Sequence, residues 1–117
     1  MIVNNTNNTN IKITKGDSFS FIFEIEDLTQ DIESAFFTCK RNADDKAKLF
    51  QKTLKNGITK LENGKYLVRV APTDTELIEQ GQYPYDLEVG INSEVYTILK
   101  GVLMLDFDVT REVKNEG

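Results

Sequence analysis

The chain has 117 residues, of which 39% are hydrophobic and 9% aromatic, and its 19 acidic and 14 basic residues give a formal net charge of −5. This size and apolar content fit one domain with one core, and the acidic balance argues against nucleic acid or an anionic membrane surface as a partner. Histidine is absent, which removes the usual general base and the commonest metal ligand. No stretch approaches the ~20 apolar residues of a membrane span, so we expect no membrane contact.

Cys39 is the single cysteine of the chain, so an internal disulfide and a cysteine-rich zinc site are excluded. Phe36, Phe37 and Thr38 precede it and look like a strand interior, so we interpret Cys39 as a small buried hydrophobe and not as a nucleophile. The glycines are scattered next to predicted turns and form no phosphate-binding loop. We therefore expect no enzyme, no catalytic residue and no cofactor.

The N-terminal residues are polar and of low complexity. The segment NNTNNTN has nothing to bury, so residues 1–10 are predicted to be a flexible arm. From Ile11 onward the pattern alternates with a period of two, and a turn at Gly16-Asp17 separates a strand over residues 11–14 from one over residues 19–25. These two strands are expected to be joined tightly.

The middle of the chain contains several further strand patterns. Residues 34–41 predict a third strand with Phe37 and Cys39 inward and with Phe36 ambiguous in direction. A polar loop over residues 42–48 follows. The remaining features are a weaker strand or short helical piece from Leu49, a turn at Asn56-Gly57, a short edge element over residues 58–61 and a firm strand over residues 66–70.

One short crossover helix is predicted near residues 73–80. Thr73 and Glu76 have the spacing of a capping box, and Gly81 is the residue expected just beyond a helix end. Because so short a helix is marginal in water, it must be docked. The apolar contacts that would dock it are Leu77 and Ile78.

The strand that follows is predicted to form a hairpin through a turn at Asn92-Ser93. The pairs expected from this turn are Ile91 with Glu94, Val89 with Tyr96, Leu87 with Ile98, and Tyr85 with Lys100. Tyr96 and Ile98 would face inward, whereas Leu105, Phe107 and Val109 have the opposite parity. We therefore predict a bulge or kink at Lys100-Gly101.

About seven short strands with one crossover helix predict an all-β, immunoglobulin-like antiparallel β-sandwich over residues 11–110, followed by a polar tail over residues 111–117. In such sandwiches a tyrosine near the start of the penultimate strand donates a hydrogen bond back to the preceding corner. Tyr83 is the first candidate and Tyr85 the second. Gly81 and Gly101 complete the predicted structural corner.

Two carboxylates on the last strand, Asp106 and Asp108, share a face and could reach one cation. No EF-hand loop or repeated Asp-Gly pattern accompanies them, and calcium prefers six to eight oxygen ligands. We therefore favour a solvated strand face and expect no metal site.

Large apolar residues occur in both phases of the last strand, at Leu99, Leu103 and Met104. Either the bulge folds them into the core, which we favour, or they form an outer surface that meets another subunit. Phe36 and Tyr96 are the aromatic residues placed where they could join such an interface.

The stretch GQYPYDLEVGINSEVYTILKGVLMLDFDVT resembles the domain that opens upper baseplate proteins in tailed phages of Gram-positive bacteria. The shared features are Gly-x-Tyr-x-Tyr-Asp-Leu, a polar hairpin tip, a Thr-x-Leu-x-x-Gly motif in slightly shifted form, and a closing Asp-Val-Thr. They lie here at Gly81, Tyr83, Tyr85-Asp86-Leu87, Thr97, Leu99-Lys100-Gly101 and Asp108-Val109-Thr110. Lys15-Gly16-Asp17 and Ser34-Ala35-Phe36-Phe37 are similar to earlier parts of that domain, so the resemblance covers most of residues 11–110.

The resemblance implies a structural protein of a phage or prophage virion, at the baseplate, tail or head surface, that is made in the cytoplasm of the bacterial host. Its partners would be other virion proteins and further copies of itself. Two alternatives remain open: a glycan-binding cell-surface module that uses Phe36 and Tyr96, and a small acidic regulator or inhibitor.

Overall fold

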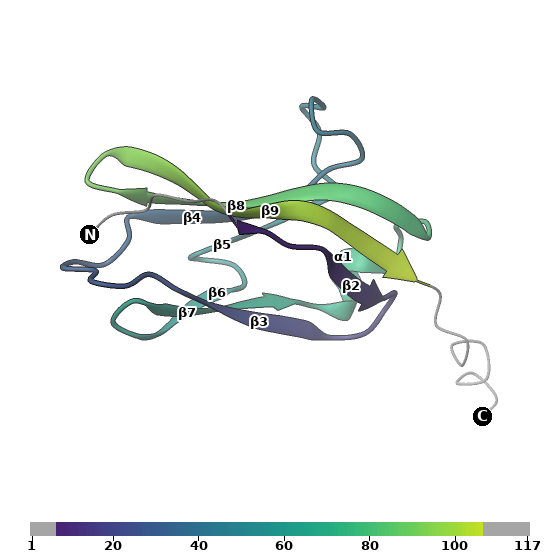
Figure 1. Ribbon diagram of the computed structural model, residues 1–117. Coiled ribbons are helices and arrows are strands. Elements are labelled where there is room, and N and C mark those ends of the chain that lie inside the picture. The colour runs from purple at the N-terminus through teal and green to yellow at the C-terminus, as the bar shows by residue number, and fades with distance from the viewer. Residues whose placement is uncertain (1–6, 107–117) are drawn as a thin grey trace.

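The computed structural model describes residues 7–106, and they form a sandwich of two β-sheets (Figure 1). The larger sheet has the order β1-β9-β8-β4-β5, with β2 also paired to β9, and the smaller sheet has the order β3-β7-β6. The strands of the larger sheet are β1 (Asn7–Asn8), β2 (Ile11–Thr14), β4 (Ser34–Cys39), β5 (Phe50–Thr53), β8 (Gly81–Ile91) and β9 (Glu94–Asp106). Those of the smaller sheet are β3 (Phe19–Glu24), β6 (Ile58–Glu62) and β7 (Lys65–Val70). The predicted tail over residues 111–117, together with Asp108, lies outside the described residues.

The strands follow the alternation of the sequence. Phe37 and Cys39 on β4 are fully buried, as predicted, and Val68 and Val70 on β7 are equally inaccessible. The short element predicted after Asn56-Gly57 is the edge strand β6, and the segment from Leu49 becomes the strand β5. The tightly joined first two strands are confirmed, but β2 pairs with β9 and β3 pairs with β7, so the turn at Gly16 carries the chain from one sheet to the other.

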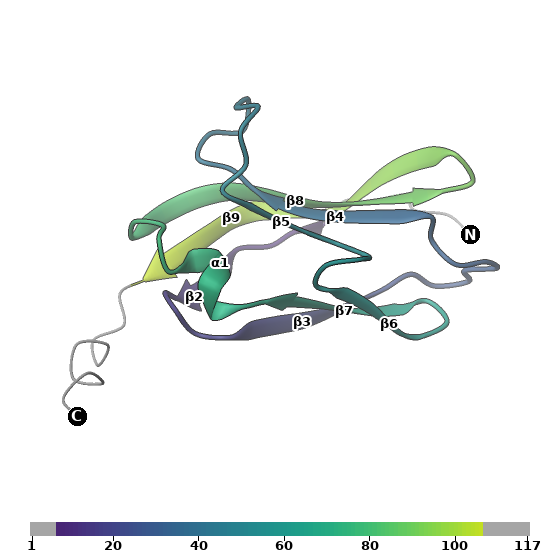
Figure 2. The same ribbon diagram turned by 180° about the vertical axis from the view of Figure 1, so that it is seen from behind.

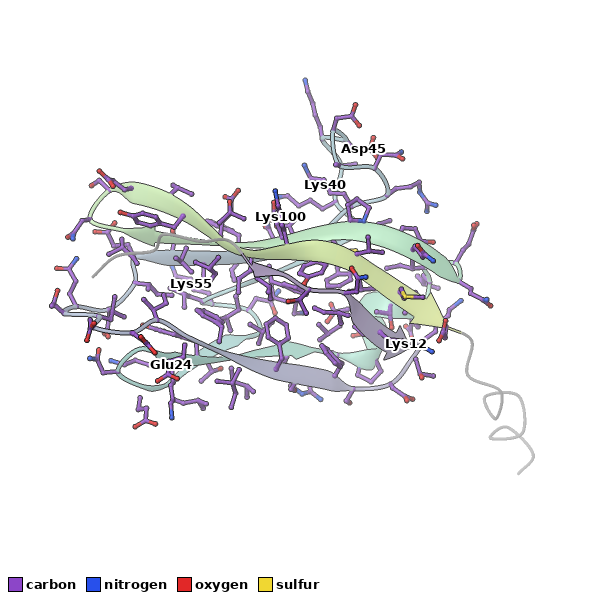
Figure 3. All side chains as sticks on the ribbon, viewed as in Figure 1. Lys12, Glu24, Lys40, Asp45, Lys55 and Lys100 are labelled. Carbon is purple, nitrogen blue, oxygen red and sulfur yellow. The ribbon has the colours of Figure 1, made fainter. Side chains whose placement is uncertain are left out.

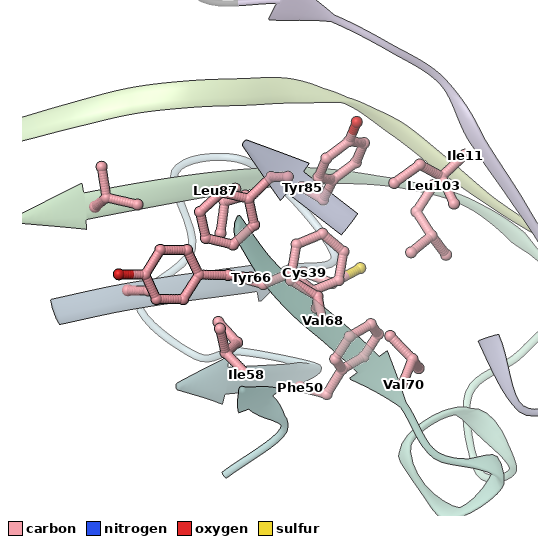
Figure 4. Close-up of a cluster of buried hydrophobic side chains, with 14 of the residues drawn as sticks. Ile11, Cys39, Phe50, Ile58, Tyr66, Val68, Val70, Tyr85, Leu87 and Leu103 are labelled. Carbon is pink, nitrogen blue, oxygen red and sulfur yellow. The ribbon is translucent and has the colours of Figure 1, made fainter. Parts of the chain in front are cut away.

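The core is centred on aromatic rings that span both sheets (Figure 4). The Phe37 ring lies 5.3 Å from that of Phe21 and 5.4 Å from that of Tyr85, so one ring of β4 contacts a ring from β3 and a ring from β8. In antibody domains a disulfide and a tryptophan occupy the corresponding centre, with the second cysteine two residues after the corner tyrosine. This chain fills that place with aromatic packing, and Tyr85 stands two residues after Tyr83.

The helix is shorter than predicted. α1 covers Pro72–Thr75 only, and its first turn is capped by the Asp74 carboxylate, which accepts a 2.7 Å hydrogen bond from the Ala71 N–H. The predicted cap at Thr73 with Glu76 is wrong, because Pro72 already begins the helix. Of the two predicted docking contacts Ile78 is 8% exposed, whereas Leu77 is 92% exposed and points to solvent.

The predicted phase change in the last strand is present but lies at another residue. The hairpin pairs Ile91 with Glu94 and Val89 with Tyr96 as expected, but Leu87 pairs with Leu99 and leaves Ile98 as an extra residue. The predicted pairs of Leu87 with Ile98 and of Tyr85 with Lys100 are therefore wrong by one residue. Because the bulge precedes Leu99, the residues that follow in the same phase turn inward.

Part of the predicted N-terminal arm is docked. β1 runs parallel to β9, with Asn7 opposite Leu99, and the Thr9 N–H donates a 2.9 Å hydrogen bond to the carbonyl of Lys100. A side chain at Gly101 would bring its Cβ within 2.1 Å of the Thr9 carbonyl oxygen. Gly101 is therefore needed for this close approach and not for the predicted kink.

None of the helices formed by residues 7–106 is long and apolar enough to cross a membrane.

Candidate binding surface

The outer face of the larger sheet carries rows of polar side chains that its register sets side by side. Phe36, Glu88 and Thr97 form one row across β4, β8 and β9. Thr38, Asp86 and Lys100 form the next row, and Gln51 of β5 extends it through a 2.9 Å hydrogen bond from its amide to the Thr38 hydroxyl. These rows lie about 7 Å apart, because two residues of strand separate them.

This face is hollowed into an open groove of about 670 Å³. The loop between β4 and β5 projects from the larger sheet, away from the smaller one (Figures 1 and 2). Ala43 and Lys48 of this loop line the groove. The lining of the groove combines aliphatic and aromatic surface with lysines, carboxylates and an amide. Its apolar contributors include Phe36, Ala43, Pro84 and Val102.

The charges of the groove are ordered along the strands. Glu88 lies in the row of Phe36, whereas Lys40 lies beside Pro84, because the Lys40 N–H donates a hydrogen bond to the Pro84 carbonyl. Lys48 of the loop also lines the groove. A strand rise of about 3.3 Å per residue places the Glu88 row roughly 13 Å from the Pro84 row. The groove is thus acidic at the end near the β8–β9 hairpin and basic at the end under the loop.

Asp86 lies between these ends. Burial raises the pKa of its carboxyl, and the positive charges of Lys40 and Lys100 partly oppose this shift by favouring the carboxylate. Lys40 and Lys100 both lie on the outer side of the larger sheet below the loop that carries Asp45 (Figure 3). The two lysines therefore stabilise an acidic group on the groove floor and can do the same for an acidic group of a ligand.

The predicted aromatic pair does not share a surface. Phe36 is 40% exposed on the outer face, in the groove. Tyr96 pairs with the buried Val89 and is one of the partly buried residues packed against the core, with its hydroxyl 2.8 Å from the Glu94 carboxylate. A glycan stacked on Phe36 could not reach Tyr96, so the two residues cannot form one aromatic platform.

The other interface candidates lie on different faces of β9, because the bulge at Ile98 sets the phase of the residues that follow it. Leu103 is 1% exposed and lies in the core, and Leu99 is partly buried and packs against the core. Their assignment to an outer interface is therefore wrong, and inward folding, which the sequence analysis favoured, is correct. Met104 lies in the outward phase between Lys12 and Gln82 and is half-buried.

The corner geometry agrees with the predicted role of Tyr83. Its hydroxyl donates a 2.6 Å hydrogen bond to the carbonyl of Glu79, four residues upstream, and Arg41 lies over its ring at 5.7 Å. A Cβ at Gly81 would lie 3.2 Å from the Tyr83 hydroxyl oxygen and 3.3 Å from the ring carbon that carries it. The Tyr85 hydroxyl instead donates to the Thr9 carbonyl, so the second candidate holds the N-terminal strand and not the corner.

No group of residues suited to hold a metal ion occurs within residues 7–106. Asp106 makes an ion pair of 3.2 Å with Lys12. Asp108, the other carboxylate considered for a cation, lies outside the described residues.

Sequence reasoning missed the groove. The sequence predicts only a polar loop over residues 42–48, and the lysines that line the groove come from two elements far apart in the chain, the β4–β5 loop and β9. The strand alternation does place Phe36, Asp86 and Glu88 on one face, but only the register of β4 against β8 shows that they are neighbours.

No protein-family model and no curated protein matches this chain. Among solved structures, it is similar to the immunoglobulin-like domain of mouse leukocyte-associated immunoglobulin-like receptor 1, at 9% identity and a TM-score of 0.52, over 90% of this chain and 96% of that one. It is similar to the extracellular domain of the voltage-gated sodium channel beta4 subunit, at 15% identity and a TM-score of 0.50, over 93% of this chain and 99% of that one. It is also similar to the NK cell receptor Nkp44, at 12% identity and a TM-score of 0.53, over 86% of this chain and 100% of that one.

These likenesses show the fold. The chain is an immunoglobulin-like β-sandwich, as its strand pattern and corner tyrosine predicted, and the similar structures belong to receptor and adhesion domains.

Proposed function

We propose that this protein is a non-catalytic association module that binds a segment of a partner protein in the groove on the outer face of its larger sheet. The observation that carries the proposal is the groove itself, in which exposed Phe36 lies beside the Glu88 carboxylate at one end and Lys40 and Lys48 lie at the other. An aromatic anchor within a concave, partly apolar site is typical of the energetic centre of protein interfaces.

The partner segment is expected to match the order of charges. An apolar side chain would pack against Phe36, Pro84 and Val102, and an acidic group would lie near Lys40 and Lys48. The partner end near Glu88 would be basic or neutral. Such complementarity fixes the direction in which a segment lies along the strands.

We place this module in a phage or prophage virion, as a structural adaptor of the baseplate, tail or head surface. The support is the resemblance of residues 81–110 and of the first strands to the domain that opens upper baseplate proteins. Two of the structurally similar proteins are described as homodimers, one strand-swapped and one parallel, which supports an expectation that this chain also associates with itself.

The test measures binding of the whole chain to the virion proteins encoded beside it. Removing the aromatic anchor by Phe36→Asp is expected to weaken binding about thirtyfold, which corresponds to about 2 kcal/mol. Val95→Asp is the matched control, because Val95 is 69% exposed and does not line the groove. Equal affinities of wild type and Phe36→Asp would reject the groove, and absence of the chain from purified particles would reject the virion role.

A further inference from the structure

The exposed edges of the two sheets are protected to different degrees. Natural sheets guard their edges by shortness, bulges, prolines or inward-pointing charges, because an unprotected edge pairs with other chains. β5 has four residues, and its Lys52 points into the sandwich to meet Asp74 at 2.8 Å. β6 is interrupted by a register shift between Lys60 and Glu62.

β3 has none of these guards. It pairs with β7 in an unbroken register from Phe19 to Glu24, and it contains neither lysine nor proline. Within residues 7–106 no strand pairs with its other edge. The side chain of Glu24 points outward from the smaller sheet (Figure 3).

The backbone direction on this edge follows from one hydrogen bond. The Ile25 N–H donates to the Gly64 carbonyl at 2.8 Å, toward the β6–β7 turn. Antiparallel strands direct alternate residues to alternate sides. The N–H and C=O groups of Ser20, Ile22 and Glu24 therefore point to the free edge.

Apolar surface accompanies these free backbone groups. Ile22 is 57% exposed and lies beside half-buried Leu67 on the outer face of the smaller sheet. Phe19 and Phe21 have the inward phase but remain only partly buried. Both faces of the sheet thus present apolar surface at the edge where hydrogen-bonding groups are unpaired.

We propose that β3 of a second copy pairs with this edge in antiparallel orientation, with Ile22 opposite Ile22 on a twofold axis. Identical strands can form such an interface because an isologous contact requires a self-complementary surface. Ser20 of each copy would face Glu24 of the other, so no like charges are opposed. Each of these three opposed pairs would exchange two backbone hydrogen bonds, and the two small sheets would become one continuous sheet.

A second copy of this chain is favoured over an unrelated strand, because β3 pairs with itself in this register without opposing like charges. Centring on Ile22 brings together an apolar stripe of Leu67, Ile22 and their two symmetry mates, and it uses every outward-directed backbone group of β3. The contact is smaller than a standard interface of roughly 1,600 Å², so the dimer is expected to dissociate on dilution. This inference goes beyond the proposed function, because it concerns a surface other than the groove.

Sedimentation equilibrium of the whole chain tests the proposal. Wild type should show a concentration-dependent dimer, and Ile22→Lys should remain monomeric, because two lysines would meet on the twofold axis. Val95→Lys is the matched control and should dimerise like wild type. A monomeric wild type, or a dimer that Ile22→Lys leaves intact, would overturn the proposal.

Cysteine cross-linking tests the register. Residues opposite one another in a hydrogen-bonded antiparallel pair have Cα atoms about 5.5 Å apart, which suits a disulfide. Ile22→Cys should therefore form a covalent dimer under mild oxidation, whereas Val95→Cys should not; native Cys39 is fully buried and cannot substitute. Equal cross-linking of both variants would reject this register.

Failure of this proposal is distinguishable from failure of the proposed function. Ile22→Lys should keep its affinity for a virion partner, and Phe36→Asp should still dimerise. A variant that loses both properties would show that the two surfaces are one, which contradicts the inference.

Discussion

The larger and the smaller sheet end in opposite ways. Beside β9 the larger sheet ends in the short strands β1 and β2, which are held by backbone pairing, by the Tyr85 hydroxyl and by the Lys12–Asp106 ion pair. Beside β3 the smaller sheet ends, within the described residues, in six residues of unguarded edge. Within residues 7–106, short strands and side-chain contacts thus protect the edges of the larger sheet, whereas the β3 edge of the smaller sheet has no such protection.

The largest loss of stability is expected from breaking the Lys52–Asp74 ion pair, which protects the edge strand β5. Asp74→Ala removes the partner of Lys52, whose side chain is 7% exposed, and the acceptor of the Ala71 N–H. Breaking a buried ion pair by deleting one partner costs about 3–5 kcal/mol, so the free energy of unfolding in urea should fall by that amount. Asp31→Ala, which breaks the exposed pair with Lys60, should cause no comparable loss; equal losses would contradict this role for Asp74.

The N-terminal closure is expected to break next, with Gly101→Ala. Its Cβ would collide with the Thr9 backbone at 2.1–2.8 Å, and overpacking of this kind costs about 1–3 kcal/mol. The midpoint of urea unfolding should fall, and the Thr9 amide, which donates to Lys100, should exchange faster. Lys100→Ala, at the exposed neighbouring position, serves as the control. Unchanged exchange at Thr9 in Gly101→Ala would contradict the close approach.

Alkaline pH should lower the free energy of unfolding progressively, because two buried groups of the larger sheet lose protons. Burial raises the pKa of the Cys39 thiol and of the Tyr85 hydroxyl, each to about 12. Their pKa values in the unfolded chain are near 9.0 and 10.0, so the folded state holds these protons more tightly. Stability should be complete below about pH 9 and fall toward pH 12, by up to about 1.4 kcal/mol per pH unit for each group. Cys39→Ala should delay the onset to about pH 10; an unchanged profile would contradict the assignment.

The hydroxyl of Tyr85 should give the smallest effect. Tyr85→Phe keeps the ring contact with Phe37 but loses the hydrogen bond to the Thr9 carbonyl, which is worth about 1 kcal/mol. Thermal unfolding should shift slightly downward, and exchange should quicken at Thr9 but not at the amides of β7. A loss distributed over both sheets would show that the hydroxyl does more than hold the N-terminal strand.

Much of the fold could be predicted because its local patterns are strong. Period-two alternation identified β2, β3, β4 and β7, and the tyrosine spacing identified the corner. The docked segment at Thr9 was missed, because polar Asn and Thr residues carry no burial signal and pair here through backbone groups. The change of parity on the last strand required a bulge but did not fix its position. It was assigned to Gly101, whereas this glycine admits the Thr9 backbone and the extra residue is Ile98.

The candidate surfaces were less accessible to prediction. Counting apolar residues on β9 left two readings of Leu99 and Leu103 open, inward folding and an outer interface. The extra residue at Ile98 decides between them, because it turns Leu103 into the core and Leu99 against it. Groove and edge both depend on register and on which strand lies outermost in a sheet. Neither property is encoded in the local pattern of one strand.

The most direct test of the open edge is amide hydrogen exchange along β3, measured residue by residue at low and at high concentration of the whole chain. The account predicts that the amides of Phe21 and Phe23 are protected at every concentration, whereas those of Ser20, Ile22 and Glu24 become protected only as the concentration rises. Protection of all five amides at every concentration, or rapid exchange of Ser20, Ile22 and Glu24 at the highest concentration, would contradict it.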